Sequence, residues 1–207
     1  MIFRTMTDHE ITRWYDSELT RTFVPQECKP LADIFRLIAD NRYEIWGLFD
    51  GASLLGYACL WKSPGTPLVL LDYLGVTETR RNEGLGAYIL QLLRQQGRPL
   101  VTESELEVAG DSESENAIRR RRIAFYERNG FTAAYPMATC GMAWQALTFA
   151  PGLDIEIVMA TQGALRTHPH RRGSSAARWA TTEATLLDEV KKSAFWRSFL
   201  PHKSTLS

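Results

Sequence analysis

The sequence predicts an α/β protein with a mixed, mostly antiparallel sheet flanked by helices. Apolar runs of strand length alternate with amphipathic segments of helical period along most of the chain. The dipeptide Asp50-Gly51 joins two of the strand candidates and supplies the positive φ angles of a tight hairpin turn. A length of 207 residues, with 44% hydrophobic and 23% charged residues, is typical of one globular domain with a buried core plus an appendage.

The first part of the chain is predicted to form a strand, two helices and a hairpin. The strand takes residues 2–6, the helices take 7–22 and 29–40, and the hairpin strands take 43–50 and 53–62. The second helix has one apolar face, because its apolar residues recur at i, i+3, i+4 and i+7: Leu31, Ile34, Phe35 and Ile38.

The middle of the chain continues with a strand, a helix and another strand. Residues 68–76 are almost entirely apolar, which indicates a strand buried on both faces in the middle of a sheet. An amphipathic helix follows and ends at Gly97, and residues 99–106 are predicted to form a fifth strand. The preceding apolar strand is therefore expected to lie beneath helices on both sides.

A third long helix and two closing strands complete this body. Ser112 and Glu115 have the spacing of a capping box, so a helix is predicted to start there and to stop at Gly130. Residues 131–138 and 141–150 are predicted to be the last two strands.

The remaining chain is predicted to be separate from this domain, which spans residues 1–152. Residues 153–181 contain an element that fits either a strand or a helix, then a linker, and residues 182–200 form a basic amphipathic helix. The formal net charge of zero conceals an asymmetry, because residues 163–207 hold eight basic and three acidic side chains. An acidic body thus carries a basic tail.

Composition also excludes several classes of protein. A formal net charge of zero argues against a dedicated nucleic-acid-binding protein. No apolar run is long enough to cross a membrane. The N-terminal residues lack the apolar stretch of a signal peptide, so export is not expected. Three dispersed cysteines suit a reducing cytoplasm, and no Cys-x-x-Cys pair or other ligand spacing predicts a metal.

A glycine loop after the apolar strand is the first candidate functional motif. The loop reads Arg81-x-x-Gly84-x-Gly86 and runs directly into an amphipathic helix. Successive backbone N–H groups and the helix N-terminus form an anion site that could hold a pyrophosphate, to which Arg81 can add its charge. The motif is neither a Walker loop nor a dinucleotide fingerprint. By itself it is equally compatible with a tight strand–helix turn that needs glycine for packing.

A tyrosine near the end of the third long helix is the second candidate motif. Tyr126 lies four residues before Gly130 and could present its hydroxyl to the sheet, although a core aromatic side chain is the alternative. Together, the two motifs resemble the GNAT superfamily of acetyl-CoA-dependent N-acetyltransferases over about residues 1–150. The matching segments are Leu74-Gly75-Val76, Arg81-Asn82-Glu83-Gly84-Leu85-Gly86, and Tyr126 with Gly130-Phe131.

The resemblance implies an acyl-CoA N-acyltransferase fold in which the strand ending near Val76 splays away from the fifth strand. It further implies a small single-domain bacterial type of enzyme that transfers acetyl from acetyl-CoA directly to an amine. Tyr126 would protonate the leaving CoA thiolate, and the backbone N–H of Val76 would meet the oxyanion. The residues expected to bind the cofactor are Leu74, Gly75, Val76, Arg81, Asn82, Glu83, Gly84, Leu85, Gly86 and Ala87.

Two parts of this site are less well defined by the sequence. Many relatives have an Asn seven residues before the tyrosine, where this chain has Arg119, in a run of four arginines that could contact CoA phosphates or simply face solvent. The base that deprotonates the amine is expected among Asp72, Glu103 and Glu105. Strand alternation places Tyr73 opposite to Asp72, so only one of the two is expected to line the site.

The acceptor is expected to be a small-molecule amine, although a peptide or protein amine and a homodimer are compatible with the resemblance. An alternative is a catalytically weak acyl-CoA sensor whose basic tail contacts a partner. Nucleic-acid binding through residues 119–122 and the tail is a third hypothesis, disfavoured by the acidic body.

Overall fold

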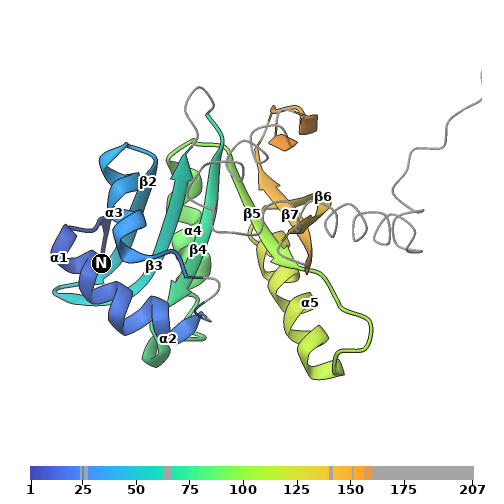
Figure 1. The fold of residues 1–207 in the computed structure, drawn as a ribbon, viewed down its shortest axis with the longest axis horizontal. Helices are drawn as coiled ribbons and strands as arrows, with labels where there is room; N and C mark the ends of the chain where they lie inside the picture. The colour runs from blue at the N-terminus through green and yellow to red at the C-terminus, as the bar shows by residue number, and fades with distance from the viewer. Residues whose placement is uncertain are drawn as a thin grey trace, which may run out of the picture.

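The structure is a computed structural model and describes residues 1–23, 25, 28–62, 67–139, 142–150, 152–156 and 158–159. Within these residues, seven strands form one sheet in the order β1-β2-β3-β4-β5-β7-β6 (Figure 1). All neighbours are antiparallel except β4 and β5, which are parallel. The strands are β1 (Ile2–Thr5), β2 (Tyr43–Asp50), β3 (Ser53–Lys62), β4 (Val69–Val76), β5 (Leu100–Glu105), β6 (Thr132–Thr139) and β7 (Met142–Phe149).

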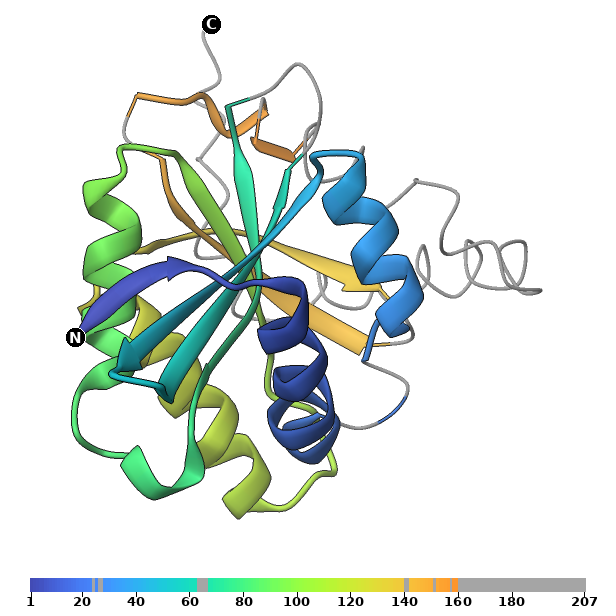
Figure 2. The ribbon, with the colours of Figure 1, turned by 90° about the vertical axis from the view of Figure 1, so that its left-hand side faces the viewer.

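Helices cover both faces of this sheet (Figure 2). One face carries α1 (Asp8–Trp14), the π-helical turn η1 (Tyr15–Leu19), α2 (Thr20–Thr22) and α3 (Leu31–Ala39), and the other carries α4 (Leu85–Gln95) and α5 (Glu113–Arg128). A 3₁₀ turn, η2 (Glu78–Arg80), connects β4 to the glycine loop. The two groups of helices create two separate apolar clusters, one on each side of the sheet.

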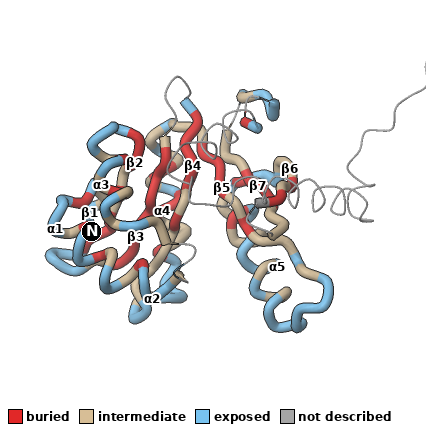
Figure 3. Tube along the Cα trace, in the orientation of Figure 1, coloured by how far each residue is buried: buried red, intermediate tan, exposed pale blue. Residues whose placement is uncertain are grey.

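The central strands are the most buried part of the molecule (Figure 3). In β4, Leu70 packs in the cluster under α1 and α3, whereas Val69 and Leu71 pack in the cluster under α4 and α5. This alternation explains why the sequence of β4 is apolar at nearly every position, as expected for a strand covered on both faces.

The predicted order of strands and helices is confirmed, and so are its local signals. Gly51 has φ +58° at the hairpin turn. At the start of α5, the backbone N–H of Glu115 donates to Ser112 Oγ over 3.3 Å, and the Ser112 N–H donates to Glu115 Oε2 over 2.9 Å. Both halves of the capping box are therefore formed.

The helix predicted over 7–22 differs from a continuous α-helix. It changes to the π-helical turn at Tyr15. Trp14 and Leu19 are five residues apart and are 1% and 0% exposed. An α-helix would turn these two side chains to different faces, whereas the wider π turn directs both into the core.

A β-bulge in β4 corrects one expectation about side-chain direction. Leu60 of β3 pairs with Leu71, and Cys59 pairs with Tyr73, so Asp72 is an extra residue on β4. An extra residue shifts the alternation of the strand by one position. Asp72 and Tyr73 therefore both face the side of α1 and α3, and the prediction that they point in opposite directions is wrong.

Some predictions fall outside the described part of the chain. These include most of the linker over 153–181, the basic amphipathic helix over 182–200, and Cys140. In the part that is described, no helix combines the length and apolar character needed to cross a membrane.

Candidate active site

The parallel strands β4 and β5 separate after a short stretch of pairing. They pair only at Val69–Leu100, Leu70–Val101 and Leu71–Thr102. Beyond this point β4 continues beside β3 as far as Val76, and β5 continues beside β7. We call this divergence the fork. The pairing of β4 with β5 ends at Leu71, so an extended ligand could lie along the inner edge of β4 as another strand would.

Tyr126 reaches the vertex of the fork from α5. Its side chain is buried, and its hydroxyl lies near Thr102, whose own hydroxyl donates to the carbonyl oxygen of Leu71 over 3.2 Å. Leu71 and Thr102 form the last pair before the strands diverge. The phenol is thus placed where β4 and β5 separate.

The surroundings of Tyr126 keep its hydroxyl protonated. Burial raises the pKa of Tyr126, and the nearby Thr102 hydroxyl and the charge of Arg122 only partly oppose this shift. The ring packs edge-on against Phe125 and Phe131, with centroids 5.3 and 5.5 Å away. A fixed, protonated phenol has the properties of a general acid at neutral pH.

The glycine loop lies on the same face of the sheet as Tyr126, because Leu85 and Tyr126 belong to one apolar cluster. Gly84 precedes α4 with φ +77°, a left-handed conformation that favours glycine, and no side chain caps this helix end. Helix geometry leaves the N–H groups of Leu85, Gly86 and Ala87 without intrahelical partners. Uncapped donors at the positive end of a helix dipole fit a pyrophosphate group.

Gly75 and Gly86 lack side chains for different reasons. A Cβ atom on Gly75 would lie 2.3 Å from Cζ of Tyr57, so packing within the protein requires glycine there. A Cβ atom on Gly86 would lie 3.4 Å from Cζ of Phe125, an ordinary contact. Internal packing therefore does not explain Gly86, whose position in the first turn of α4 is compatible with close approach of a ligand.

The other predicted cofactor residues surround the same region. Leu74 and Val76 are partly buried and pack against the cluster that contains Leu85 and Tyr126. Asn82 has φ +68°, and the exposed Glu83 forms an ion pair with Arg80 rather than with Arg81. The fold thus brings the residues of β4, the glycine loop and Tyr126 together on one side of the fork.

The acidic residues predicted as the general base lie in different surroundings. Asp72 is largely buried, accepts a hydrogen bond from the hydroxyl of Tyr43, and pairs with Lys29 over 2.6 Å between Nζ and Oδ2. Glu103 lies two positions after Val101, which packs on the side of α1 and α3. Strand alternation places Glu103 on that side as well, opposite to Tyr126.

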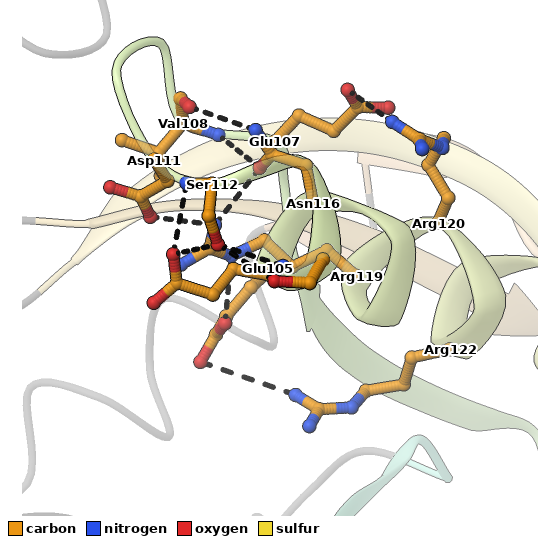
Figure 4. A network of polar contacts seen from close by, with 11 residues as sticks. Glu105, Glu107, Val108, Asp111, Ser112, Asn116, Arg119, Arg120 and Arg122 are labelled. Atoms are coloured by element: carbon orange, nitrogen blue, oxygen red, sulfur yellow. Dashed lines mark hydrogen bonds and ion pairs between the residues drawn. The ribbon is translucent and has the colours of Figure 1, made fainter.

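Glu105 and Arg119 belong to an ion-pair network at the start of α5 (Figure 4). Arg119 Nε lies 3.1 Å from Glu105 Oε2, and its Nη1 lies 2.7 Å from Asp111 Oδ2. Arg122 is more exposed and approaches Glu105 at 4.0 Å. These pairs connect β5 to α5, and they engage the guanidinium of Arg119 within the protein. A contact between Arg119 and CoA stays a prediction.

Sequence reasoning missed two important neighbours. Thr102 gave no signal within an ordinary strand pattern, although it connects Tyr126 with Leu71. Lys29 contacts Asp72 across 43 positions of the chain, a separation that no local pattern reveals. In the described ranges, no group of three or more His, Cys, Asp and Glu side chains is arranged to hold a metal ion.

A mixed sheet forked between two parallel strands, with a glycine loop leading into the next helix, is the fold of an acyl-CoA N-acyltransferase. Residues 41–133 match the family model of the acetyltransferase (GNAT) domain. Residues 41–133 thus match the domain that the motifs indicated, and the predicted fold class is confirmed.

Solved structures support the fold. A candidate GNAT-family acetyltransferase from Bacteroides thetaiotaomicron superimposes with a TM-score of 0.59 at 22% identity, covering 80% of this chain and 94% of that one. An aminoglycoside 6'-N-acetyltransferase complexed with coenzyme A gives 0.55 at 15% identity, covering 74% and 100%. A ribosomal-protein-alanine N-acetyltransferase from Brucella melitensis gives 0.53 at 14% identity, covering 72% and 99%. No curated protein sequence matched the chain.

Proposed function

We propose that this protein transfers the acetyl group of acetyl-CoA to an amine by direct attack. The observation that carries the proposal is the position of Tyr126, whose protonated hydroxyl lies at the vertex of the fork and on the same face as the glycine loop. Acetyl-CoA would supply a thioester whose acyl carbon is open to a nucleophile. One structural relative was solved as a complex with coenzyme A, which is consistent with this choice.

In this proposal, the cofactor and the amine bind on opposite faces of the sheet at the fork. The N–H groups at the start of α4 and the inner edge of β4 would hold the cofactor on the side of α4 and α5. Tyr126 would donate its proton to the leaving thiolate, and the N–H of Val76 would stabilise the oxyanion. The amine would approach from the side of α1 and α3, where Asp72 and Glu103 can accept its proton.

Two measurements test the proposal. Calorimetry should show saturable binding of acetyl-CoA, and a panel of small amines assayed for release of free CoA should identify an acceptor. Absence of acetyl-CoA binding at tens of micromolar would overturn the proposal. Binding without turnover on any amine, peptide amines included, would instead favour an acyl-CoA sensor.

A further inference from the structure

The ammonium group of Lys29 is enclosed by three aromatic rings and a carboxylate. Its Nζ lies 4.5, 5.3 and 5.8 Å from the ring centroids of Trp61, Tyr73 and Tyr43. The same atom lies 2.6 Å from Oδ2 of Asp72. We call Tyr43, Trp61, Tyr73 and Asp72 the ammonium cage. Aromatic faces combined with a carboxylate are the chemistry by which proteins recognise alkylammonium ligands.

The cage is buried and braced from several elements. The side chains of Lys29 and Asp72 are only 15% and 13% exposed. The Tyr43 hydroxyl from β2 donates to the same carboxylate oxygen, and the backbone N–H of Lys29 donates to the Tyr73 hydroxyl over 3.3 Å. Trp61 completes the cage from β3. This enclosure distinguishes the pair of Lys29 and Asp72 from an exposed ion pair, which contributes little to stability.

The position of the cage connects it to the fork. Asp72 directly follows Leu71, the last residue of β4 that pairs with β5. The bulge directs Asp72 and Tyr73 to the side of α1 and α3, whereas Tyr126 lies on the opposite side. The Lys29 ammonium therefore lies beside the fork on the face from which an acceptor amine would approach.

A cavity of about 270 Å³ adjoins the segment that carries Lys29. Its lining includes Cys28 and Pro30, the two sequence neighbours of Lys29, together with Tyr15, Thr20 and Pro25. Small-molecule sites begin at roughly 300 Å³. The cavity is slightly smaller than this, and its described lining includes neighbours of Lys29 but none of the residues of the cage itself.

We propose that Lys29 occupies the place of the acceptor's ammonium group, and that the acceptor is a linear primary alkylammonium that displaces it. That this ligand is the acceptor rests on the proposed function. That the cage binds an ammonium group does not depend on it. A four-carbon stem ending in a primary ammonium reproduces the lysine side chain. A quaternary ammonium cannot take this place, because it has no N–H to donate to Asp72 at 2.6 Å.

The first test measures binding without acetyl transfer. Lys29→Ala empties the cage, and calorimetry should show that this variant binds n-butylammonium at least about tenfold more tightly than the wild type, a difference of about 1.4 kcal/mol. Neither n-butanol nor butyltrimethylammonium should bind comparably. Lys29→Met should not gain the binding, because its uncharged stem still fills the cage. The double variant Lys29→Ala with Asp72→Asn should lose it.

The second test measures transfer to n-butylamine. Lys29→Ala should have a KM for the amine at least about tenfold below that of the wild type, because the resident competitor is gone. Lys62→Ala is the matched control, since Lys62 also pairs with a carboxylate, that of Glu44, at 2.8 Å and has a side chain 21% exposed. Lys62 directly follows Trp61 on β3, but strand alternation turns its side chain and Glu44 to the opposite face of the sheet from the cage, so its removal should leave this KM unchanged.

The outcomes separate the two proposals. If Lys29→Ala binds n-butylammonium no more tightly than the wild type, the cage is not an ammonium site and the inference is wrong. If transfer occurs with the same KM in both proteins, Lys29 does not occupy the acceptor's place. If the amine binds but no variant transfers acetyl to any amine, the proposed function fails while the cage remains an ammonium site.

Discussion

Replacing Tyr126 by Phe tests the assignment of the general acid directly. The substitution removes one hydroxyl and keeps the ring that packs against Phe125 and Phe131. Loss of a general acid lowers turnover by about 10²- to 10⁴-fold. The glycine loop and the inner edge of β4 are unchanged, so the affinity for acetyl-CoA should stay the same.

The structural cost of this substitution should be small. The Tyr126→Phe variant would lose only the polar contact of the hydroxyl with its neighbour Thr102, worth at most about 1 kcal/mol. For a chain of this size, such a loss lowers the melting temperature by roughly 2–4 °C. A large loss of activity with a small loss of stability distinguishes a chemical role from a packing role.

The assay is steady-state release of CoA, combined with calorimetry for acetyl-CoA binding. Tyr135→Phe on β6, at the edge of the sheet, is a matched control that should retain full turnover. Because burial raises the pKa of Tyr126, the wild type should keep its acid protonated at neutral and mildly alkaline pH. A Tyr126→Phe rate within threefold of the wild type, or a parallel loss of acetyl-CoA affinity, would refute the assignment.

Four further substitutions probe the cofactor loop, the ion-pair network and acid stability. Gly86→Ala should fold normally, since its nearest contact is 3.4 Å, yet lose about tenfold in acetyl-CoA affinity by calorimetry; unchanged affinity would place the ligand elsewhere. Gly75→Ala should instead cost about 1–3 kcal/mol in urea unfolding, because its Cβ would lie 2.3 Å from a tyrosine ring, and normal stability would contradict that packing. Arg119→Ala should lower the melting temperature by several degrees with less than a threefold change in acetyl-CoA affinity, because two carboxylates lose their partner. A tenfold loss of affinity at unchanged stability would make Arg119 a cofactor ligand. Burial alone would raise the pKa of Glu44, but hydrogen bonds from a lysine, a tryptophan and an arginine lower it from 4.5 to about 2. The ionised Glu44 carboxylate therefore stabilises the fold fully above pH 4.5, and this contribution is lost as the pH falls toward 2. Glu44→Gln should therefore show a shallower loss of stability over that range, and an unchanged acid slope would contradict the linkage.

The sequence by itself determined the order of the elements and the two motifs that identify the family. Turns, caps and amphipathic faces depend on residues within a few positions of one another. The hairpin at Gly51, the capping box at Ser112 and the doubly buried β4 could therefore be predicted correctly. The glycine loop and Tyr126 could be named for the same reason, since each is a local pattern.

Only the tertiary structure determined which side chains lie on each face of the fork. The bulge at Asp72 depends on how β3 pairs with β4, and it reverses the direction that simple alternation predicts for Tyr73. The contact of Tyr126 with Thr102 and the enclosure of Lys29 join segments that are distant in the chain. Such contacts arise from strand pairing and helix packing over long separations, which leave no periodic trace in the sequence.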